Sequence, residues 1–193
     1  MKLPHNQVLD IFRETKALLE GHFQLTSGLH SPHYFQCAKV LQYPKYLHLF
    51  AGEIAKHFAY AEIEVVISPA IGGVVVGTEV GRMMGVRTMF AERNDGVMAL
   101  RRGFELRSGE RVLVVEDVVT TGGSVSEVME IVRKSGATVS GVGFIVDRSN
   151  GKTRFEAKQF SVLQMDAITY KPAECPLCAA GSKAVKPGSR GNT

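Results

Sequence analysis

The chain has 193 residues, 45% hydrophobic and 22% charged, a balance typical of one globular domain with its own core. No apolar run reaches membrane-spanning length and residues 1–19 are amphipathic rather than signal-like, so we expect a cytoplasmic protein with no membrane partner. The formal net charge of +4 suits either nucleic-acid binding or an enzyme that gathers Arg and Lys around an anionic substrate. Three cysteines predict no disulfide framework and fit a reducing compartment.

The first sixty residues show two helical patterns separated by an alternating stretch. Apolar residues at helical spacing predict an amphipathic helix over 7–19, ended by Gly21. Residues 23–40 alternate around Ser27-Gly28, which predicts a short hairpin. A second helix is expected to start near Pro44.

From Val65 onward, short apolar runs alternate with helical patterns. The predicted strands are 65–67, 87–92, 112–115, 139–147 and 160–165, and the predicted helices are 74–84 and 124–136. Such alternation predicts an α/β fold with a mainly parallel sheet, flanked by helices and joined by right-handed crossovers. The polar stretch 93–103 is expected to be an irregular, mobile loop.

The most informative stretch joins the predicted strand 112–115 to the helix that follows it. The strand stops on Glu116 and Asp117, whose oxygens could accept hydrogen bonds from a vicinal diol. A run of small and hydroxylic residues then leads to Ser124, at a helix N-terminus suited to a phosphate. Ser124 and Glu127 have capping-box spacing. Together these features predict a site for a ribose 5-phosphate.

Three further segments are expected around the same pocket. Gly72 and Gly73 follow a strand and could hold a pyrophosphate on backbone amides, although a Gly pair can equally serve a plain turn. Arg93, Arg101 and Arg102 offer permanent positive charge for phosphate oxygens, or form an ordinary solvated basic loop. The strand 139–147 ends on Asp147, followed by Arg148, which pairs either with a substrate carboxylate or with Asp147.

The stretch 112–124 resembles the signature for phosphoribosyl pyrophosphate (PRPP) of the type I phosphoribosyltransferases, and as far as about Tyr170 the chain is similar to the orotate-specific branch. The residues that carry this closer resemblance are Ser27-Gly28, Ser31-Pro32 and Tyr34-Phe35. The resemblance implies a type I fold with a small N-terminal hood, transfer of phosphoribose from PRPP to orotate in UMP synthesis, and Mg²⁺ held mainly by PRPP rather than by the protein. It also implies a homodimer with shared active sites.

The resemblance also implies roles for individual residues. Glu116 and Asp117 would take the ribose hydroxyls, without either being a general base, and Arg93 would belong to a mobile loop that reaches the neighbouring subunit. Arg93, Asp117, Arg101 and Arg102 are the expected catalytic residues. The expected PRPP contacts are Arg93, Gly72, Gly73, Glu116, Asp117, Val118, Val119, Thr120, Thr121, Gly122, Gly123 and Ser124. The expected orotate contacts are Tyr34, Phe35, Thr120 and Arg148.

The chain departs from the family pattern at three places. Thr26 stands where many members carry Lys, Ile71-Gly72 where many carry a Tyr–Lys pair, and Asn94 follows Arg93 in place of a Lys-rich, His-containing loop. The lysine contacts therefore do not transfer, and we expect Arg101 or Arg102 to supply the missing charge.

We expect residues 1–171 to form the phosphoribosyltransferase domain, with the hood mainly from 1–40, and 172–193 a tail that is extended or partly disordered. Cys175 and Cys178 make half of a zinc pattern, but no second Cys pair or close His pair is found in the sequence, so two ordinary thiols are favoured over a shared zinc site. The rival functions are transfer to a purine or another base, opposed by the hood and Arg148, and a PRPP-sensing regulator that binds nucleic acid, opposed by the absence of any such motif.

Overall fold

The structure, a computed structural model, describes residues 3–25, 27–149, 151–165 and 168–187. Thr26, one of the departures above, and the last six residues of the tail lie outside the described residues. The elements in chain order are α1 (His5–Glu14), β1 (Leu18–Gln24), β2 (His30–Phe35), α2 (Ala38–Leu41), α3 (Pro44–His57), β3 (Val65–Pro69), α4 (Gly72–Met84), β4 (Arg87–Asn94), β5 (Val97–Leu100), β6 (Arg111–Val119), α5 (Gly123–Lys134), β7 (Thr138–Asp147), β8 (Gln159–Gln164), the 3₁₀ helix η1 (Pro172–Glu174) and α6 (Pro176–Ala179).

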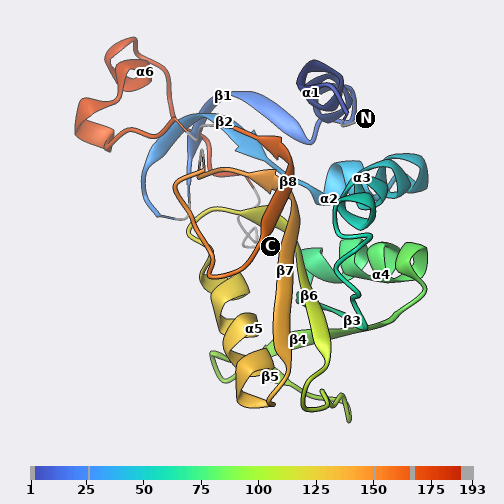
Figure 1. The fold of residues 1–193 in the computed structure, drawn as a ribbon. Helices are drawn as coiled ribbons and strands as arrows, with labels where there is room; N and C mark the ends of the chain where they lie inside the picture. The colour runs from blue at the N-terminus through green and yellow to red at the C-terminus, as the bar shows by residue number, and fades with distance from the viewer. Residues whose placement is uncertain (1–2, 26, 150, 166–167, 188–193) are drawn as a thin grey trace.

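A six-stranded sheet in the order β5-β4-β3-β6-β7-β8 forms the centre of the molecule, with helices on both sides (Figure 1). All neighbouring strands are parallel except β4 and β5, which confirms the mainly parallel α/β fold. Alternate residues of β6 enter two separate cores. Leu113 and Val115 pack with the side of α1, α3 and α4, whereas Val112 and Val114 pack with α5. Because both faces are covered, β6 is buried along most of its length.

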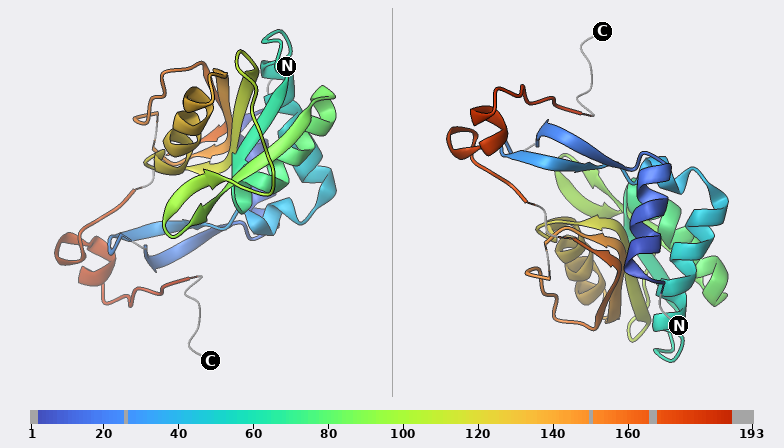
Figure 2. Two further views of the ribbon diagram at one scale, coloured as in Figure 1. Left: turned by 90° about the horizontal axis from the view of Figure 1, so that it is seen from below. Right: turned by 90° about the horizontal axis from the view of Figure 1, so that it is seen from above.

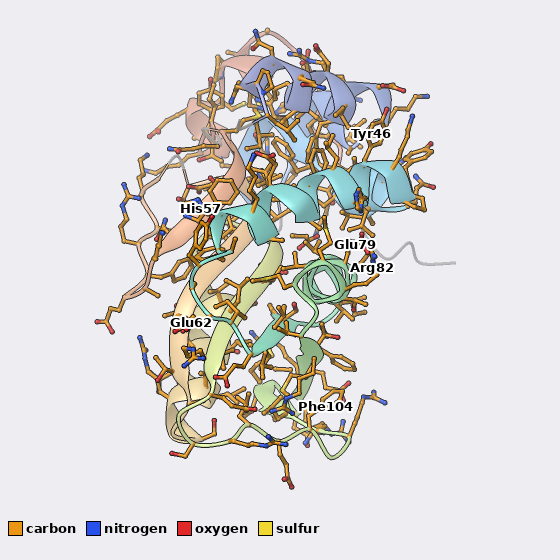
Figure 3. The ribbon with its side chains drawn as sticks, turned by 45° about the vertical axis from the view of Figure 1, so that its right-hand side comes forward. Tyr46, His57, Glu62, Glu79, Arg82 and Phe104 are labelled. Atoms are coloured by element: carbon orange, nitrogen blue, oxygen red, sulfur yellow. The ribbon has the colours of Figure 1, made fainter. Side chains whose placement is uncertain are left out.

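Polar contacts join the two helices on the α3 side. Glu79 on α4 accepts hydrogen bonds from Arg82 at 2.8 Å and contacts His48 of α3 at 2.9 Å, and Figure 3 shows Glu79 and Arg82 side by side. The Arg82 guanidinium holds the pKa of Glu79 at about 2. Among the described residues, we find no helix with the length and apolar character required to span a bilayer.

The N-terminal helix is shorter than its sequence pattern indicates. α1 ends at Glu14, and Lys16 then adopts a φ of 54° that turns the chain, so the prediction of a helix to residue 19 is wrong. Leu18 and Leu19 belong to β1, and Gly21 lies inside that strand instead of ending a helix. Leu18 is buried in the same core as residues of α1. Its burial was therefore predicted correctly, but its backbone is a strand and not a helix.

The predicted hairpin is present as the antiparallel pair β1–β2. Gly28, with a φ of 81°, forms its turn, and the Gly28 amide donates to the Leu25 carbonyl at 2.9 Å. The register shifts between Glu20 and Phe23, which marks a bulge in β1. The hairpin stands apart from the central sheet, and the α6 segment lies at the end of the hairpin far from α1 (Figure 2).

The stretch 93–103 is not an irregular loop, and this expectation is corrected. β4 continues to Asn94 and pairs with β5 in an antiparallel hairpin. Asp95 and Gly96 both have positive φ, the conformation that a two-residue hairpin turn requires. The structure therefore holds Arg93 on a strand.

The tail is ordered against the hairpin as far as residue 187. The Gln24 amide donates to the Val185 carbonyl at 2.8 Å, and the Val185 amide donates to the His22 carbonyl at 2.9 Å. His30 and Tyr170 exchange a pair of backbone hydrogen bonds at 2.9 and 2.8 Å. Residues 168–187 therefore extend the hood on both of its edges, while the domain boundary at residue 171 stays a prediction.

Candidate functional site

The two carboxylates predicted to follow the strand lie on it instead, because β6 continues to Val119. Glu116 is 9% exposed and accepts a hydrogen bond from the Asp117 amide at 3.0 Å. Asp117 is half-buried and accepts from the Val118 amide at 2.9 Å. Each acid is thus held by the backbone amide that follows it.

The first turn of α4 approaches this acidic pair closely. α4 begins at Gly72, two residues before the expected start. A Cβ on Gly73 would lie 2.8 Å from Glu116 Oε1, and a Cβ on Gly72 would lie 2.6 Å from Asp117 Cγ. Both contacts are too short for a side chain, so the glycine pair brings the positive end of the α4 dipole onto the carboxylates. This gives the pair a packing role beside the acids; whether the amides also hold a pyrophosphate stays a prediction.

The acidic pair is electrostatically asymmetric. Burial, and then the charge of Asp117, raise the pKa of Glu116 to about 9. At neutral pH Glu116 is therefore protonated, and its carboxyl group can donate one hydrogen bond as well as accept others. The negative charge of the pair resides on Asp117.

The loop after β6 closes a cavity of about 250 Å³ at the N-terminus of α5, called the cradle below. The cradle is lined by Arg93, Glu116 and residues 118–125. Gly122 precedes α5 with a φ of 79°, and Thr153 Oγ1 donates to the Thr120 carbonyl at 2.8 Å, which fixes the loop. The first N–H groups of α5 have no helical acceptor and face this end of the helix. The capping box is wrong, because no side chain caps α5.

Only one of the three predicted basic residues reaches the cradle. Arg93 lines it, donates to the Gly96 carbonyl at 2.8 Å, and pairs with Glu127 of α5 at 3.0 Å. This ion pair is the actual role of Glu127, which was expected to cap the helix.

Arg101 and Arg102 lie on the other side of the β4–β5 hairpin. They pair with Glu92 at 3.9 and 3.0 Å, and both side chains are more than half exposed. Within this chain the structure therefore does not bring them to the acids.

A second cavity, of about 590 Å³, opens between the hairpin and the ends of β6 and β7, and is called the hood pocket below. Its lining is Leu25, Ser27, Leu29, Tyr34, Phe35, Val118, Thr120, Thr121, Arg148 and Thr169. It shares Val118, Thr120 and Thr121 with the cradle. The predicted orotate residues therefore all line one cavity, and that cavity adjoins the phosphate loop.

Strand register places Arg148 beside the phosphate loop. Asp147 lies opposite Val119, and the Arg148 amide donates to the Val119 carbonyl at 2.8 Å. The alternative of an Asp147–Arg148 ion pair is not observed, because Asp147 accepts from the Ser149 hydroxyl and amide at 2.6 and 2.8 Å. Asp147 thus organises its own loop and leaves the guanidinium to the pocket.

Arg148 is a half-buried cation that pairs with no carboxylate in the described part of the chain. Its guanidinium carbon lies 5.5 Å from the centre of the Phe35 ring, and its Nε is buried with no hydrogen-bond acceptor there. Burial lowers the pKa of Arg148, although a guanidinium stays charged near neutral pH. An anionic ligand that enters the pocket would complete the coordination of this group.

Some lining residues carry no signal in the sequence. Thr169 reaches the pocket from the tail, and Thr153 supports the phosphate loop from the segment after β7. A third cavity, of about 540 Å³, lies between Cys37, Ile71 and Asp117, on the other side of the acidic pair. Thr153 and Thr169 reach the site from segments far away in the sequence, and such contacts leave no local sequence pattern that could predict them.

Comparison with known proteins agrees with this geometry. The phosphoribosyl transferase domain model matches residues 39–177. An orotate phosphoribosyltransferase of Chlorobaculum parvum is 60% identical over 98% of this chain and 98% of its own length. The solved orotate phosphoribosyltransferase of Aeropyrum pernix has a TM-score of 0.70 at 23% identity, covering 82% of this chain and 93% of its own.

A solved adenine phosphoribosyltransferase of Rhodothermus marinus has nearly the same fold, with a TM-score of 0.66 at 17% identity, and covers 83% of this chain and 99% of its own. The fold is therefore common to enzymes named for different bases, and the closer placement rests on sequence identity. By the domain match and by 60% identity over nearly its whole length, this chain belongs to the phosphoribosyltransferase family, among the orotate phosphoribosyltransferases.

Proposed function

We propose that this protein transfers the phosphoribosyl group of PRPP to orotate, giving orotidine 5′-monophosphate and pyrophosphate for UMP synthesis. The observation that carries the proposal is the pair of adjoining cavities with a common wall at Val118, Thr120 and Thr121. One cavity has the backbone amides and hydroxyls for a phosphate, and the other has a half-buried cation, Arg148, for a carboxylate. Ribose C1 would lie where the two cavities meet.

The cradle would hold the sugar phosphate. Thr121, Gly122, Gly123 and Ser124 would donate to the 5-phosphate at the start of α5, where the helix dipole also favours an anion. Asp117 and the protonated Glu116 would bind the two ribose hydroxyls, one as a charged acceptor and the other as a donor and acceptor. As pyrophosphate departs, C1 gains positive charge, which the negative Asp117 would stabilise.

The hood pocket would select the base. The Arg148 guanidinium supplies the charge that the orotate carboxylate or ring carbonyls require, and Phe35 stacks against that guanidinium. Tyr34 and Thr120 line the same space. Purine bases have no carboxylate to pair with Arg148, whose Nε is buried without an acceptor, so this cation favours orotate over adenine.

Pyrophosphate release would depend on Arg93 and Mg²⁺. Mg²⁺ prefers oxygen ligands and commonly binds through substrate phosphates with few protein carboxylates. The site fits that pattern, because Glu116 lines the cradle and Asp117 follows it directly on β6. Bound with PRPP, the ion would neutralise charge on the leaving pyrophosphate. Arg93, which already lines the cradle, would add a fixed cation on the same group.

The family resemblance also leads us to propose a cytoplasmic homodimer in which Arg101 and Arg102 act at the partner's site. Their exposure at the outside of the β4–β5 hairpin supports this role. An inactive Arg101→Ala/Arg102→Ala variant mixed with inactive Asp117→Asn should recover about a quarter of wild-type turnover, since half of the randomly mixed dimers carry one intact site. No recovery in verified mixed dimers contradicts the shared site.

The experiment that tests the function mixes the protein with Mg²⁺, PRPP and orotate and follows the ultraviolet absorbance of orotate. Parallel reactions contain adenine, guanine or uracil in place of orotate. Orotate should be consumed with release of pyrophosphate, whereas the other bases should not react. Consumption of a purine alone would establish the rival base specificity, and PRPP binding without turnover would favour the regulator.

A further inference from the structure

Four residues with metal-binding side chains meet where the tail covers the hairpin, far along the chain from one another. They are His22 on β1, His30 at the start of β2, Cys175 between η1 and α6, and Cys178 on α6. The expectation that the Cys pair had no His partners is therefore wrong. His22, His30 and Cys175 are buried, and Cys178 closes the cluster from the solvent side.

The spacing of the four candidate ligand atoms matches one tetrahedral ion. Zn–N bonds of about 2.0–2.1 Å and Zn–S bonds of about 2.3 Å place ligand atoms roughly 3.3 Å (N to N), 3.5 Å (N to S) and 3.8 Å (S to S) apart. His22 Nε2 lies 2.9 Å from His30 Nδ1, 3.6 Å from Cys175 Sγ and 3.8 Å from Cys178 Sγ. Cys178 Sγ is 3.3 Å from His30 Nδ1, and all four atoms lie within 4.8 Å of one another.

The surroundings of His22 orient its ring for metal binding. His22 Nδ1 lies 3.0 Å from the Ser182 carbonyl oxygen, which only accepts hydrogen bonds, so Nδ1 carries the proton. In the neutral ring this leaves the lone pair on Nε2, the atom that points to the other three residues. Metal-bound histidines usually donate their second ring N–H to a carbonyl or carboxylate in this way.

Two histidines on facing strands lie close together near the end of the hairpin. Gln24, not His22, lies opposite His30 in the register, and the pairing shifts between Glu20 and Phe23. His22 lies inside this irregular segment, and its ring packs against that of His30 at 4.8 Å between centres.

The ligand set favours zinc over other metal centres. Two thiolates and two imidazoles in tetrahedral arrangement are typical of structural Zn²⁺ sites, and the Cys-x-x-Cys spacing at 175–178 matches such sites. A two-iron cluster with two His ligands holds the His and Cys pairs on separate irons. Here each pair contacts the other at 3.3–3.8 Å, which leaves room for a single ion.

We propose that His22, His30, Cys175 and Cys178 bind one structural zinc ion that fastens the C-terminal segment to the hood. All four positions of the ion are filled by protein, so the site is structural and not catalytic. The ion lies next to the His30–Tyr170 backbone pair, and the Ser31 hydroxyl donates to the Ile168 carbonyl at 2.8 Å. Thr169, between these contacts, lines the hood pocket, so the zinc would hold one wall of that pocket in place.

The test measures zinc in the full chain, without reference to its activity. Reduced protein is incubated with zinc sulfate, desalted and analysed by elemental mass spectrometry. About one equivalent per chain is expected, and Cys178→Ser should lose it. Cys37→Ser removes the third cysteine, and His5→Gln removes an exposed histidine on α1; both should retain zinc. Replacement by Co²⁺ should produce the visible bands of tetrahedral cobalt and near-ultraviolet thiolate charge transfer.

Binding well below one equivalent in reduced wild-type protein would overturn the proposal, as would full binding in Cys178→Ser. Should that variant fail to fold, wild-type protein decides the question through a thiol-specific mercurial and a colour-forming chelator. Release of zinc as two thiols react supports the site. Zinc that stays bound after all accessible thiols have reacted refutes it.

Discussion

Replacing Gly122 with alanine tests whether the loop before α5 is held in place by close packing against Thr153 and Phe155. Gly122 has a φ of 79°, and an added Cβ would lie 2.8 Å from Thr153 Cγ2 and 2.9 Å from the Phe155 ring. Left-handed backbone costs an alanine about 1–2 kcal/mol, and crowding in a packed region costs about 1–3 kcal/mol more. The free energy of unfolding should therefore fall by roughly 2–5 kcal/mol.

Gly85→Ala is the matched control, because Gly85 has a φ of 69° but no atom within 4 Å of the added Cβ. It should lose only the conformational part, about 1–2 kcal/mol. Thermal unfolding of both variants should then differ by about 2–12 °C in Tm, at about 2–4 °C per kcal/mol for a chain of this size. Equal Tm values would show that Thr153 and Phe155 move aside freely and do not hold the cradle.

The Gly122 variant should also weaken substrate binding, which the control should not. Displacement of the loop moves the first amides of α5 away from the 5-phosphate, and catalytic geometry is sensitive to shifts of about 1 Å. The KM for PRPP should rise in Gly122→Ala and stay unchanged in Gly85→Ala. An unchanged KM in both would separate the packing of the loop from its proposed role.

Three further predictions concern charge. Arg93→Ala should lower kcat about 100-fold with little change in PRPP binding, because this cation is needed as pyrophosphate leaves. Steady-state kinetics measures kcat, and a binding titration measures the affinity for PRPP. Equal losses in kcat and in PRPP affinity would contradict this role. Arg148→Met keeps an apolar side chain over Phe35 but removes the charge. Because a charged hydrogen bond contributes about 1.5–3 kcal/mol, kcat/KM for orotate should fall about 10- to 100-fold, while the KM for PRPP should not change. Glu116→Gln should weaken the fall of stability with rising pH. The pKa of Glu116 is raised from an ordinary 4.5 to about 9, so from pH 4.5 to 9 the folded state holds a proton that the unfolded state has lost, and wild-type stability decreases across that window. Urea midpoints at pH 5, 7 and 9 measure this slope, and identical slopes would refute a buried neutral acid.

The parts of the fold that could be predicted are those encoded locally. The alternation of apolar runs with helical patterns predicted the central sheet, and the stretch 112–124 predicted a strand, an acidic pair and a helix start. The structure places Glu116 and the helix start around the cradle, whereas Asp117 lines the third cavity. Leu18 and Leu19 misled because an apolar residue at helical spacing and one in a short strand look alike in sequence. Asp95-Gly96 was a hairpin signal that the polar composition of 93–103 obscured.

What could not be predicted depends on contacts between distant segments. The tail, residues 172–193, was expected to be extended or partly disordered because it is rich in Pro, Gly, Ala and Lys. Its order comes from backbone pairing with β1 and β2, as between His30 and Tyr170 or Gln24 and Val185, which lie far apart in the chain. No sequence pattern around the two histidines predicts the two cysteines, or the reverse, so only the folded chain brings the two pairs together.

The acidic pair also shows why position on a strand decides chemistry. Two ionised carboxylates side by side would repel each other. In the structure Glu116 is buried under Gly73 while Asp117 remains half-exposed, and burial moves the proton onto Glu116. The pair is therefore stable before any ligand arrives, with one neutral and one charged acid. A ribose diol that binds there meets a hydrogen-bond donor and a negative charge already in place, so no charge has to be rearranged as C1 becomes positive.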